Sequence, residues 1–507
     1  AYWNHTPLLV VTPQAANKTM GQGGFQEVEQ MNLFKDMVCY QEEVRDPSRM
    51  AEVLNRVIEK AFRGSAPAQI NVPRDYWTQV IDIELPPIVR FERQGGGKEA
   101  IENAAKLLSK AKFPVILSGA GVVLGGAIDE CKKLAEKLDA PVCNGYQHND
   151  SFPGSHPLAV GPLGYNGSKA AMELISKADV VLALGTRLNP FSTLPGYGID
   201  YWPKKATIIQ VDMNPDRIGL TKKVSVGICG DAKQVAQQIL DKLSSDAGNT
   251  GREERKNLIH KTKSAWLQTL SGLDHEEDDP GTVWNKEARE RDKDRMSPRQ
   301  AWRAIQDALP QDAIISSDIG NNCAIGNAYP TFEKPRKYLA PGLFGPCGYG
   351  FPAILGAKIG CPDTPVVGFA GDGAFGISMN EMSSCAREEW PAITMVIFRN
   401  YQWGAEKRNS ILWFDDNFVG TELDPELSYA KVANACGLKG VTCKTMEETT
   451  KAIKQSCEDQ KKGITTFIEI ILNQELGEPF RRDAMKKPVK VAGIKKEDMK
   501  KQPSLIS

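Results

Sequence analysis

The hydrophobic positions divide the chain into short apolar runs separated by longer amphipathic stretches. Each apolar run has the length of a buried strand, and each amphipathic stretch has the 3.6-residue period of a helix. The pattern predicts strands at 8–12, 68–72, 114–118, 141–143, 179–183, 206–211, 365–370 and 393–398, and helices at 47–63, 99–111, 126–138, 168–177 and about 378–388. Buried strands that alternate with helices are typical of doubly wound parallel sheets, so we predict an α/β fold.

Breaks in this alternation predict the domain boundaries. The Pro- and Gly-rich stretch 86–98 has the composition of a linker, and the charge-rich stretch 246–297 that of an exposed helical linker. The α/β regions between them are 1–90, 98–245 and 298–475, followed by a Lys-rich tail at 476–507. A length of 507 residues suits three such domains. The first region opens on a helix end that runs into a core strand, so we expect this domain to be incomplete.

Composition and charge narrow the class of protein. Lys plus Arg and Asp plus Glu each number 63, so the net charge is zero and gives no reason to expect binding to nucleic acid or to a membrane surface. No apolar run approaches the ~18 residues of a membrane span. The eleven cysteines form no CxxC pair, which in a chain of this size indicates reduced thiols in a cytoplasmic protein.

The most informative stretch runs from Gly371 to Asn400. It is predicted as a strand, a Gly-Asp-Gly turn, a helix and a second strand. The carboxyl ends of both strands meet at one edge of a parallel sheet, which places Asp372 beside Asn400. Their oxygens suit Mg²⁺, and Gly371 and Gly373 let the backbone approach phosphates. An isolated Gly-Asp-Gly is equally a surface turn, but the flanking strands favour a site for magnesium and a diphosphate.

A second glycine-rich stretch, GAGVVLGG at 119–126, also follows a strand and opens a helix. This context invites a dinucleotide-binding interpretation. The glycines do not fit the GxGxxG spacing, however, and the favoured interpretation is a tight strand-to-helix crossover.

Several segments together resemble the thiamine diphosphate-dependent, acetolactate synthase-like superfamily. The 371–400 stretch is similar to its thiamine diphosphate motif, which begins with GDG and ends in an Asn pair. Further similar elements are PLLVVTPQ with GQGGFQEVEQ (7–14 and 21–30), SSDIGNN (316–322) and LFGPCGYGFPAILGAKIG (343–360). The resemblance covers nearly the whole chain. It implies three doubly wound parallel-sheet domains, namely the C-terminal part of a pyrimidine-binding domain, a central domain and a diphosphate-binding domain, with thiamine diphosphate and Mg²⁺ as cofactors.

The resemblance also implies roles for individual residues. The metal ligands are expected to be Asp372, Asn400 and the backbone carbonyl of Gln402, whereas Arg399 departs from the motif because it replaces the first Asn of the pair. Expected cofactor-binding residues are Ile319, Gly320, Asn321, Asn322, Gly345, Cys347, Gly371, Gly373 and Ala374. Cys347 takes the place of a larger Met that props the cofactor into its bent shape. Gln14, Phe25 and Gln26 are expected on the catalytic, substrate-facing side of the cofactor.

Within the superfamily, the chain resembles the sulfoacetaldehyde acetyltransferase family. The similar segments are 146–156, 184–203, 400–410 and 477–494. The resemblance implies a transferase of sulfonate (taurine) catabolism that converts sulfoacetaldehyde and phosphate to acetyl phosphate and sulfite. Two anionic substrates call for cations, so the expected substrate-binding residues are Lys407, Arg408, Arg187 and the pair Arg481 and Arg482. His148 is expected at the substrate as a proton donor near neutral pH. For each cation the alternative is a solvated surface charge, and for His148 a structural role.

The resemblance leaves two points open. The family needs a Glu that hydrogen-bonds the aminopyrimidine ring, and no residue here matches it, because the family places it before PLLVVTPQ. We therefore expect that the intact protein includes a preceding segment. The alternatives are an acetolactate synthase or α-keto acid decarboxylase, and a non-catalytic scaffold. The synthases carry a Lys-His element where this chain reads DMVCYQEEV (36–44), which disfavours that chemistry. The superfamily builds its site between subunits, so a homodimer or homotetramer is expected.

Overall fold

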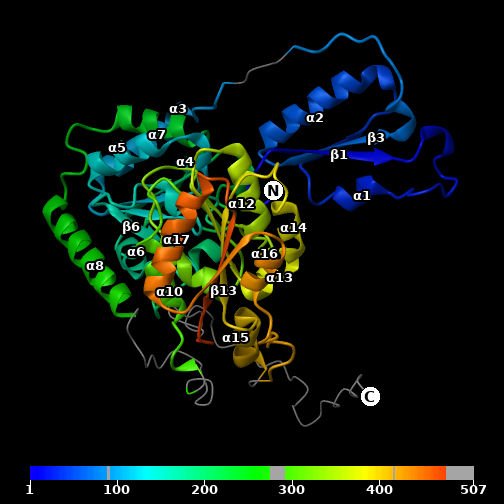
Figure 1. The fold of residues 1–507 in the computed structure, drawn as a ribbon. Coiled ribbons are helices and arrows are strands. Elements are labelled where there is room, and N and C mark those ends of the chain that lie inside the picture. Colours follow the sequence, from blue (N-terminus) through cyan, green and yellow to red (C-terminus); the bar gives the residue numbers. More distant parts are fainter. Residues whose placement is uncertain (88–91, 274–289, 291, 415–416, 476–507) are drawn as a thin grey trace. The chain divides into compact units, whose positions relative to one another are not determined.

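The computed structural model describes residues 1–87, 92–273, 290, 292–414 and 417–475. The chain divides into two compact units, one of residues 1–92 with 342–345, and one that contains the other described residues. Three parallel sheets carry the fold, one of three strands in the first unit and two of six strands in the second (Figure 1). The predicted α/β class with three parallel-sheet domains is confirmed.

The first unit is a three-stranded sheet with the order β1-β3-β2. Its strands are β1 (Leu8–Gln14), β2 (Tyr40–Glu43) and β3 (Pro67–Pro73), and its helices are α1 (Gln30–Phe34) and α2 (Met50–Gly64). The buried side chains of α2, Val53, Val57 and Ala61, recur at helical spacing and pack on the sheet. Asp46 lies before this helix, where its carboxylate accepts the N–H of Ser48 at 2.9 Å and caps a 3-10 turn.

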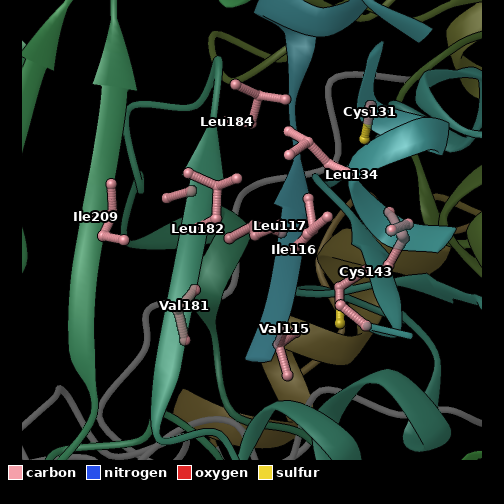
Figure 2. Close-up of a cluster of buried hydrophobic side chains, with 14 of the residues drawn as sticks. Val115, Ile116, Leu117, Cys131, Leu134, Cys143, Val181, Leu182, Leu184 and Ile209 are labelled. Atoms are coloured by element: carbon pink, nitrogen blue, oxygen red, sulfur yellow. The ribbon is translucent and has the colours of Figure 1, made fainter. Parts of the chain in front are cut away.

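The central sheet has the order β6-β5-β4-β7-β8-β9. Its strands are β4 (Pro114–Ser118), β5 (Val142–Asn144), β6 (Ala159–Pro162), β7 (Val180–Leu184), β8 (Thr207–Asp212) and β9 (Val226–Cys229). Val115, Leu117 and Leu182 point from adjacent strands into one continuous core (Figure 2). Strands buried on both faces lack polar alternation, which is why these runs read as continuous apolar segments.

Helices cover both faces of the central sheet. They are α3 (Lys98–Lys110), α4 (Ala120–Gly125), α5 (Ile128–Leu138), α6 (Lys169–Ile175) and α7 (Ala232–Lys242). Of these, α3, α5 and α7 gather into one layer (Figure 1). The GAGVVLGG stretch is the crossover from β4 to α5, and it contains α4, a short helix that the sequence pattern missed.

Residues 252–273 form the long helix α8 (Arg252–Leu273). Helix was expected here, but as an exposed linker, and one side of α8 is buried. Arg255 is 1% exposed and donates to five backbone carbonyls, those of Lys112, Leu138, Asp139, Gly248 and Thr250. Farther along the helix, Ile259 joins the core of the central sheet and Trp266 that of the C-terminal sheet. The remainder of the charge-rich stretch, from 274 to 289, and the tail from 476 to 507 lie outside the described residues.

The C-terminal sheet has the order β11-β10-β12-β13-β15-β14. Its strands are β10 (Ile314–Ser317), β11 (Tyr338–Leu339), β12 (Val366–Gly371), β13 (Thr394–Arg399), β14 (Lys439–Cys443) and β15 (Thr466–Ile471). The helices are α10 (Pro298–Gln306), α11 (Asn321–Ile325), α12 (Gly350–Gly360), α13 (Asp372–Ser378), α14 (Met382–Cys385), α15 (Gly404–Trp413), α16 (Tyr429–Ala435) and α17 (Met446–Gln460).

One predicted helix is wrong in its bounds. A helix was expected at about 378–388 after a free Gly-Asp-Gly turn, whereas α13 begins at Asp372 and the chain continues through a 3-10 turn into α14. Gly371 is the extended residue before the helix, so the strand passes into the helix without a loop. Among the described residues, no helix is long and apolar enough to cross a membrane.

Candidate active site

Three neighbouring strands of the C-terminal sheet end together at its carboxyl edge. β12 pairs in parallel with β10 on one side and with β13 on the other. The segments that follow these strands begin at Asp318, Asp372 and Asn400. The structure therefore brings the predicted diphosphate loop at 319–322 and the predicted metal ligands to one edge. This edge is where open parallel sheets bind ligands.

Asp372 is 1% exposed and its carboxylate is held from several sides. Oδ2 accepts the backbone N–H of Tyr401 at 2.6 Å and Nη1 of Arg399 at 3.0 Å. Oδ1 accepts the N–H of Gly373 at 3.0 Å. Burial raises the pKa of Asp372 to about 6, against the opposing effects of Arg399 and of the backbone donors. The side chain is thus fixed before any metal binds.

Asn400 and Gln402 follow β13 and are both buried. Nδ2 of Asn400 and Oε1 of Gln402 have no hydrogen-bond partner among the described residues. Both atoms are therefore available to a ligand at this edge. An amide donor suits a phosphate oxygen, and oxygens of Asp372, Asn400 and Gln402 suit Mg²⁺. The described part of the chain has no cluster of three or more His, Cys, Asp and Glu, which is compatible with one carboxylate assisted by amide and carbonyl oxygens.

The glycines at this edge fall into two kinds. A Cβ added to Gly320 or Gly371 would meet no atom within 4 Å, so the backbone there faces open space. Gly320 also has a φ of 129°, which an L side chain rarely adopts. A Cβ on Gly373, in contrast, would lie 2.8 Å from the Trp403 ring. Gly320 and Gly371 leave room for a diphosphate, whereas Gly373 is required for packing.

Asp318 is a site residue that the sequence interpretation missed. Its Oδ1 accepts the N–H groups of Ile319 (2.7 Å) and Gly348 (3.1 Å), and its Oδ2 accepts that of Gly350 at 2.6 Å. One buried carboxylate thereby ties the 318–322 loop to the 346–350 loop that carries Cys347. The Cys347 thiol is partly buried, and burial raises its pKa, so it is a neutral packing group. For Asp318, the available sequence signal was its place in SSDIGNN, directly after Ser317.

Comparison with known proteins decides the family. Residues 101–239 match the central domain of thiamine pyrophosphate enzymes, and residues 318–470 match their C-terminal TPP binding domain. The chain is 78% identical over 502 residues to a protein of Rhizobium meliloti named probable sulfoacetaldehyde acetyltransferase, covering 99% of this chain and 85% of the relative. It is 77% identical over 502 residues to the sulfoacetaldehyde acetyltransferase of Roseovarius nubinhibens, covering 99% and 83%.

The chain belongs to the sulfoacetaldehyde acetyltransferase family. It is an acyltransferase, and the two matched domains make it a thiamine diphosphate enzyme. A more distant relative is a probable acetolactate synthase large subunit of Methanocaldococcus jannaschii, 28% identical over 470 residues, which covers 90% of this chain and 76% of the relative. The predicted family and superfamily are both confirmed.

Two of the predicted substrate-binding cations, Lys407 and Arg408, lie on α15 and differ in their contacts. Arg408 lies on α15 and is 4% exposed, so it is not a solvated surface charge. Its Nη1 donates to Oδ1 of Asn321 at 2.9 Å, and its guanidinium lies 5.3 Å from the ring centre of Tyr165. Lys407 instead bonds Glu422 at 2.6 Å. Of the two, Arg408 is joined directly to the predicted diphosphate loop.

The central domain brings two other predicted substrate residues together. His148 follows β5, Arg187 follows β7, and the positive charge of Arg187 acts on the imidazole. Loss of solvent around the His148 ring, aided by this repulsion, lowers its pKa to about 4, so the imidazole is neutral at pH 7. Burial and the neighbouring Arg217 lower the pKa of Arg187 to about 10. Arg481 and Arg482 lie outside the described residues.

The remaining predicted residues belong to the first unit. Gln14 is buried at the end of β1 and donates to the carbonyl of Val28 at 3.3 Å. Phe25 is 82% exposed, and Gln26 beside it has a φ of 60°. Gly345 also groups with this unit. An exposed phenylalanine in a strained loop is unusual for a packed fold and is a common feature of surfaces that meet a ligand or a partner.

Proposed function

We propose that this protein converts sulfoacetaldehyde and phosphate to acetyl phosphate and sulfite, with thiamine diphosphate and Mg²⁺ as cofactors. The observation that carries the proposal is the 77–78% identity, over 99% of the chain, to relatives named for this substrate and acyl transfer. The reaction balances internally. The aldehyde carbon loses its hydrogen as a proton and is oxidised to the acyl level, while the neighbouring carbon loses sulfite with the electron pair of the carbon–sulfur bond and gains a proton to become the methyl group. A new bond joins the acyl carbon to a phosphate oxygen, and because the oxidation and the reduction occur in the same molecule, no external oxidant is required.

The residues at the C-terminal edge suit this function. Asp372, Asn400 and the carbonyl of Gln402 would hold Mg²⁺, and Gly320 with Gly371 would admit the diphosphate. When bound, thiamine diphosphate supplies a nucleophilic carbon and an electron sink, and the protein has to bind and orient the reactants. Asp372 is the one carboxylate among the three proposed metal ligands, so a bound Mg²⁺ would keep positive charge for the phosphates.

Arg408 is the residue that we propose for binding the sulfonate or the phosphate. It is buried beside a group of aromatic rings in which Phe191 lies 5.1 Å from Tyr146 and 5.5 Å from Tyr165. A cation in such a dry setting attracts an anion more strongly than a solvated one does. The planar guanidinium also offers paired donors that match a sulfonate or phosphate.

The decisive test uses protein expressed from its complete coding sequence. With thiamine diphosphate, Mg²⁺, sulfoacetaldehyde and phosphate, we expect equal amounts of sulfite and acetyl phosphate. Pyruvate is offered in a parallel reaction. Consumption of pyruvate without sulfite release would favour an acetolactate synthase. Cofactor binding with neither reaction would contradict both enzymes, and no cofactor binding by calorimetry at saturating Mg²⁺ would support a scaffold.

A further inference from the structure

Arg399 occupies the last position of β13, where the thiamine diphosphate motif has an Asn. It is 1% exposed, and an arginine is rarely buried this completely without partners. Nη1 donates to Oδ2 of Asp372 at 3.0 Å, and Nη2 donates to the carbonyls of Asp424 and Leu427. The guanidinium also lies 4.2 Å from the ring centre of Tyr401. The larger side chain therefore joins the predicted metal ligand to the segment that precedes α16.

A second carboxylate, Glu469, faces the same guanidinium. Glu469 lies on β15, next to β13, is 2% exposed, and its Oε1 is 3.7 Å from Nε of Arg399. It also accepts the hydroxyl of Ser428 at 2.6 Å and the N–H of Tyr429 at 3.2 Å. Tyr429 in turn donates its hydroxyl to the backbone carbonyl of Asp372 at 2.8 Å. Asp372, Arg399 and Glu469 thus form one buried network, which we call the charge triad.

The charge triad carries a net charge of minus one. If Arg399 stood alone beside Asp372, the pair would be neutral and would attract a divalent cation weakly. Glu469 supplies the counter-charge for the guanidinium, so the negative charge of Asp372 remains available to a metal. A buried arginine without its carboxylate partners would also be costly, because each ion needs compensation away from water.

The contacts also distinguish the two oxygens of Asp372. Oδ2 accepts from both Arg399 and the N–H of Tyr401, whereas Oδ1 accepts from the N–H of Gly373. A carboxylate oxygen has about two acceptor sites, so Oδ2 is filled and Oδ1 retains one. The contacts therefore direct Oδ1 toward the metal.

We propose that Glu469 offsets the charge of Arg399, so that the replacement of Asn by Arg leaves the negative charge of Asp372 available to Mg²⁺ and preserves metal affinity. The inference rests on the magnesium site of the proposed function and not on the identity of the substrate. Outer-shell partners of metal ligands typically change metal affinity about 10- to 100-fold when they are removed.

The test is a double-mutant cycle of Arg399→Asn and Glu469→Gln. The Kd of thiamine diphosphate is measured by calorimetry at a series of Mg²⁺ concentrations, and apo-protein Tm is measured in parallel. In E469Q, Arg399 neutralises Asp372, so the apparent Mg²⁺ affinity should fall at least about 10-fold with little change in Tm. In R399N, Glu469 is buried without a cation, so Tm should fall by about 5 °C or more while Mg²⁺ affinity is retained. The double variant should return to within about threefold of wild-type affinity.

Asp459→Asn is the matched control. Asp459 is also a buried carboxylate in an ion pair, with Lys439, but this pair lies at the opposite, amino end of the same sheet. Its substitution should leave the Mg²⁺ dependence unchanged. Wild-type Mg²⁺ affinity in E469Q, or a double variant no better than E469Q, would overturn the proposal. These two variants decide the matter even if R399N does not fold. Cofactor binding by wild-type protein without any divalent ion would instead refute the metal site itself.

Discussion

The two six-stranded sheets of the second unit have similar carboxyl edges, but they differ in the space beside their glycine-rich crossovers. Each has a glycine-rich crossover after a central strand, Gly371–Gly373 in the C-terminal sheet and Gly119–Gly121 in the central sheet. A Cβ on Gly371 would meet nothing within 4 Å, whereas a Cβ on Gly121 would lie 2.7 Å from Cα of Gly185. One crossover is open to a ligand, and the other is filled by the backbone at the end of the neighbouring strand.

The hydrogen bonds at the central crossover agree with its packing. The N–H of Gly119 donates to the carbonyl of Leu184 at 3.1 Å, and that of Gly121 donates to Gly185 at 2.8 Å. These donors are consumed within the fold, which supports the interpretation of GAGVVLGG as a tight crossover. A glycine-rich turn after a strand therefore has two physical causes, access for a ligand and close approach of two backbones, and only the surroundings separate them.

The largest effect is expected at the open edge. Asp372→Asn keeps the size of the side chain but removes the one carboxylate among the proposed metal ligands, so thiamine diphosphate binding in Mg²⁺ should weaken by at least about 100-fold. Calorimetry with and without EDTA measures this, and circular dichroism checks that the fold is intact. Cofactor affinity within a few-fold of wild type would show that the metal does not depend on Asp372.

Two matched alanine substitutions compare the edges directly. Gly121→Ala forces a Cβ against the backbone of Gly185 and should reduce the free energy of unfolding by about 2 kcal/mol, with cofactor affinity unchanged. Gly371→Ala meets no atom of the protein, so stability should stay within about 0.5 kcal/mol of wild type, whereas a bound diphosphate would be crowded and affinity should fall about 10-fold.

Denaturant unfolding and calorimetry on the same two preparations provide the measurement. If G371A binds the cofactor as wild type does, the backbone at this position does not approach the diphosphate. If G121A is as stable as wild type, the backbones at Gly121 and Gly185 can move apart without cost, contrary to what their close contact indicates.

The meeting of strand ends at the carboxyl edge of the C-terminal sheet was predictable because its signals are local. Apolar runs locate β12 and β13, and the rule for parallel strands then places Asp372 beside Asn400 without any knowledge of side-chain packing. Seven strands were not predicted, namely β2, β6, β9, β10, β11, β14 and β15. Of these, β2, β6 and β9 are only four residues long and each contains a charged residue, Gly or Pro, which blurs the strand pattern.

Long-range roles were not predictable in this way. Asp318 collects N–H groups from Gly348 and Gly350, and Arg399 needs Glu469, which lies two strands away along the chain and beside it in the sheet. Arg255 sits in a charge-rich stretch whose composition indicates solvent exposure, yet carbonyls from several segments converge on it. Composition describes the average residue of such a stretch and cannot identify the one residue that tertiary structure buries.

The smallest effect is expected at Asp150, a buried carboxylate that follows β5 of the central sheet. Asp150 is 2% exposed, and its Oδ2 accepts the N–H groups of Lys337 (2.9 Å) and Tyr338 (3.3 Å). Among the described residues, its carboxylate forms no ion pair with a cationic side chain. Burial raises the pKa of Asp150 from 3.8 to about 6. The protonated form is therefore favoured in the folded state, so its contribution to stability is present below pH 3.8 and is lost as the pH rises through about 6.

Asp150→Asn should remove this dependence. Between pH 4 and pH 7.5, wild type should lose on the order of 2 kcal/mol of unfolding free energy relative to D150N. His148→Asn provides a control of opposite sign, because the pKa of His148 is lowered to about 4 and its contribution is lost as the pH falls. Urea unfolding across this range measures both differences. A wild-type minus D150N difference that is flat with pH would mean that folding does not raise the pKa of Asp150, and that the N–H groups of Lys337 and Tyr338 offset the cost of burying its negative charge.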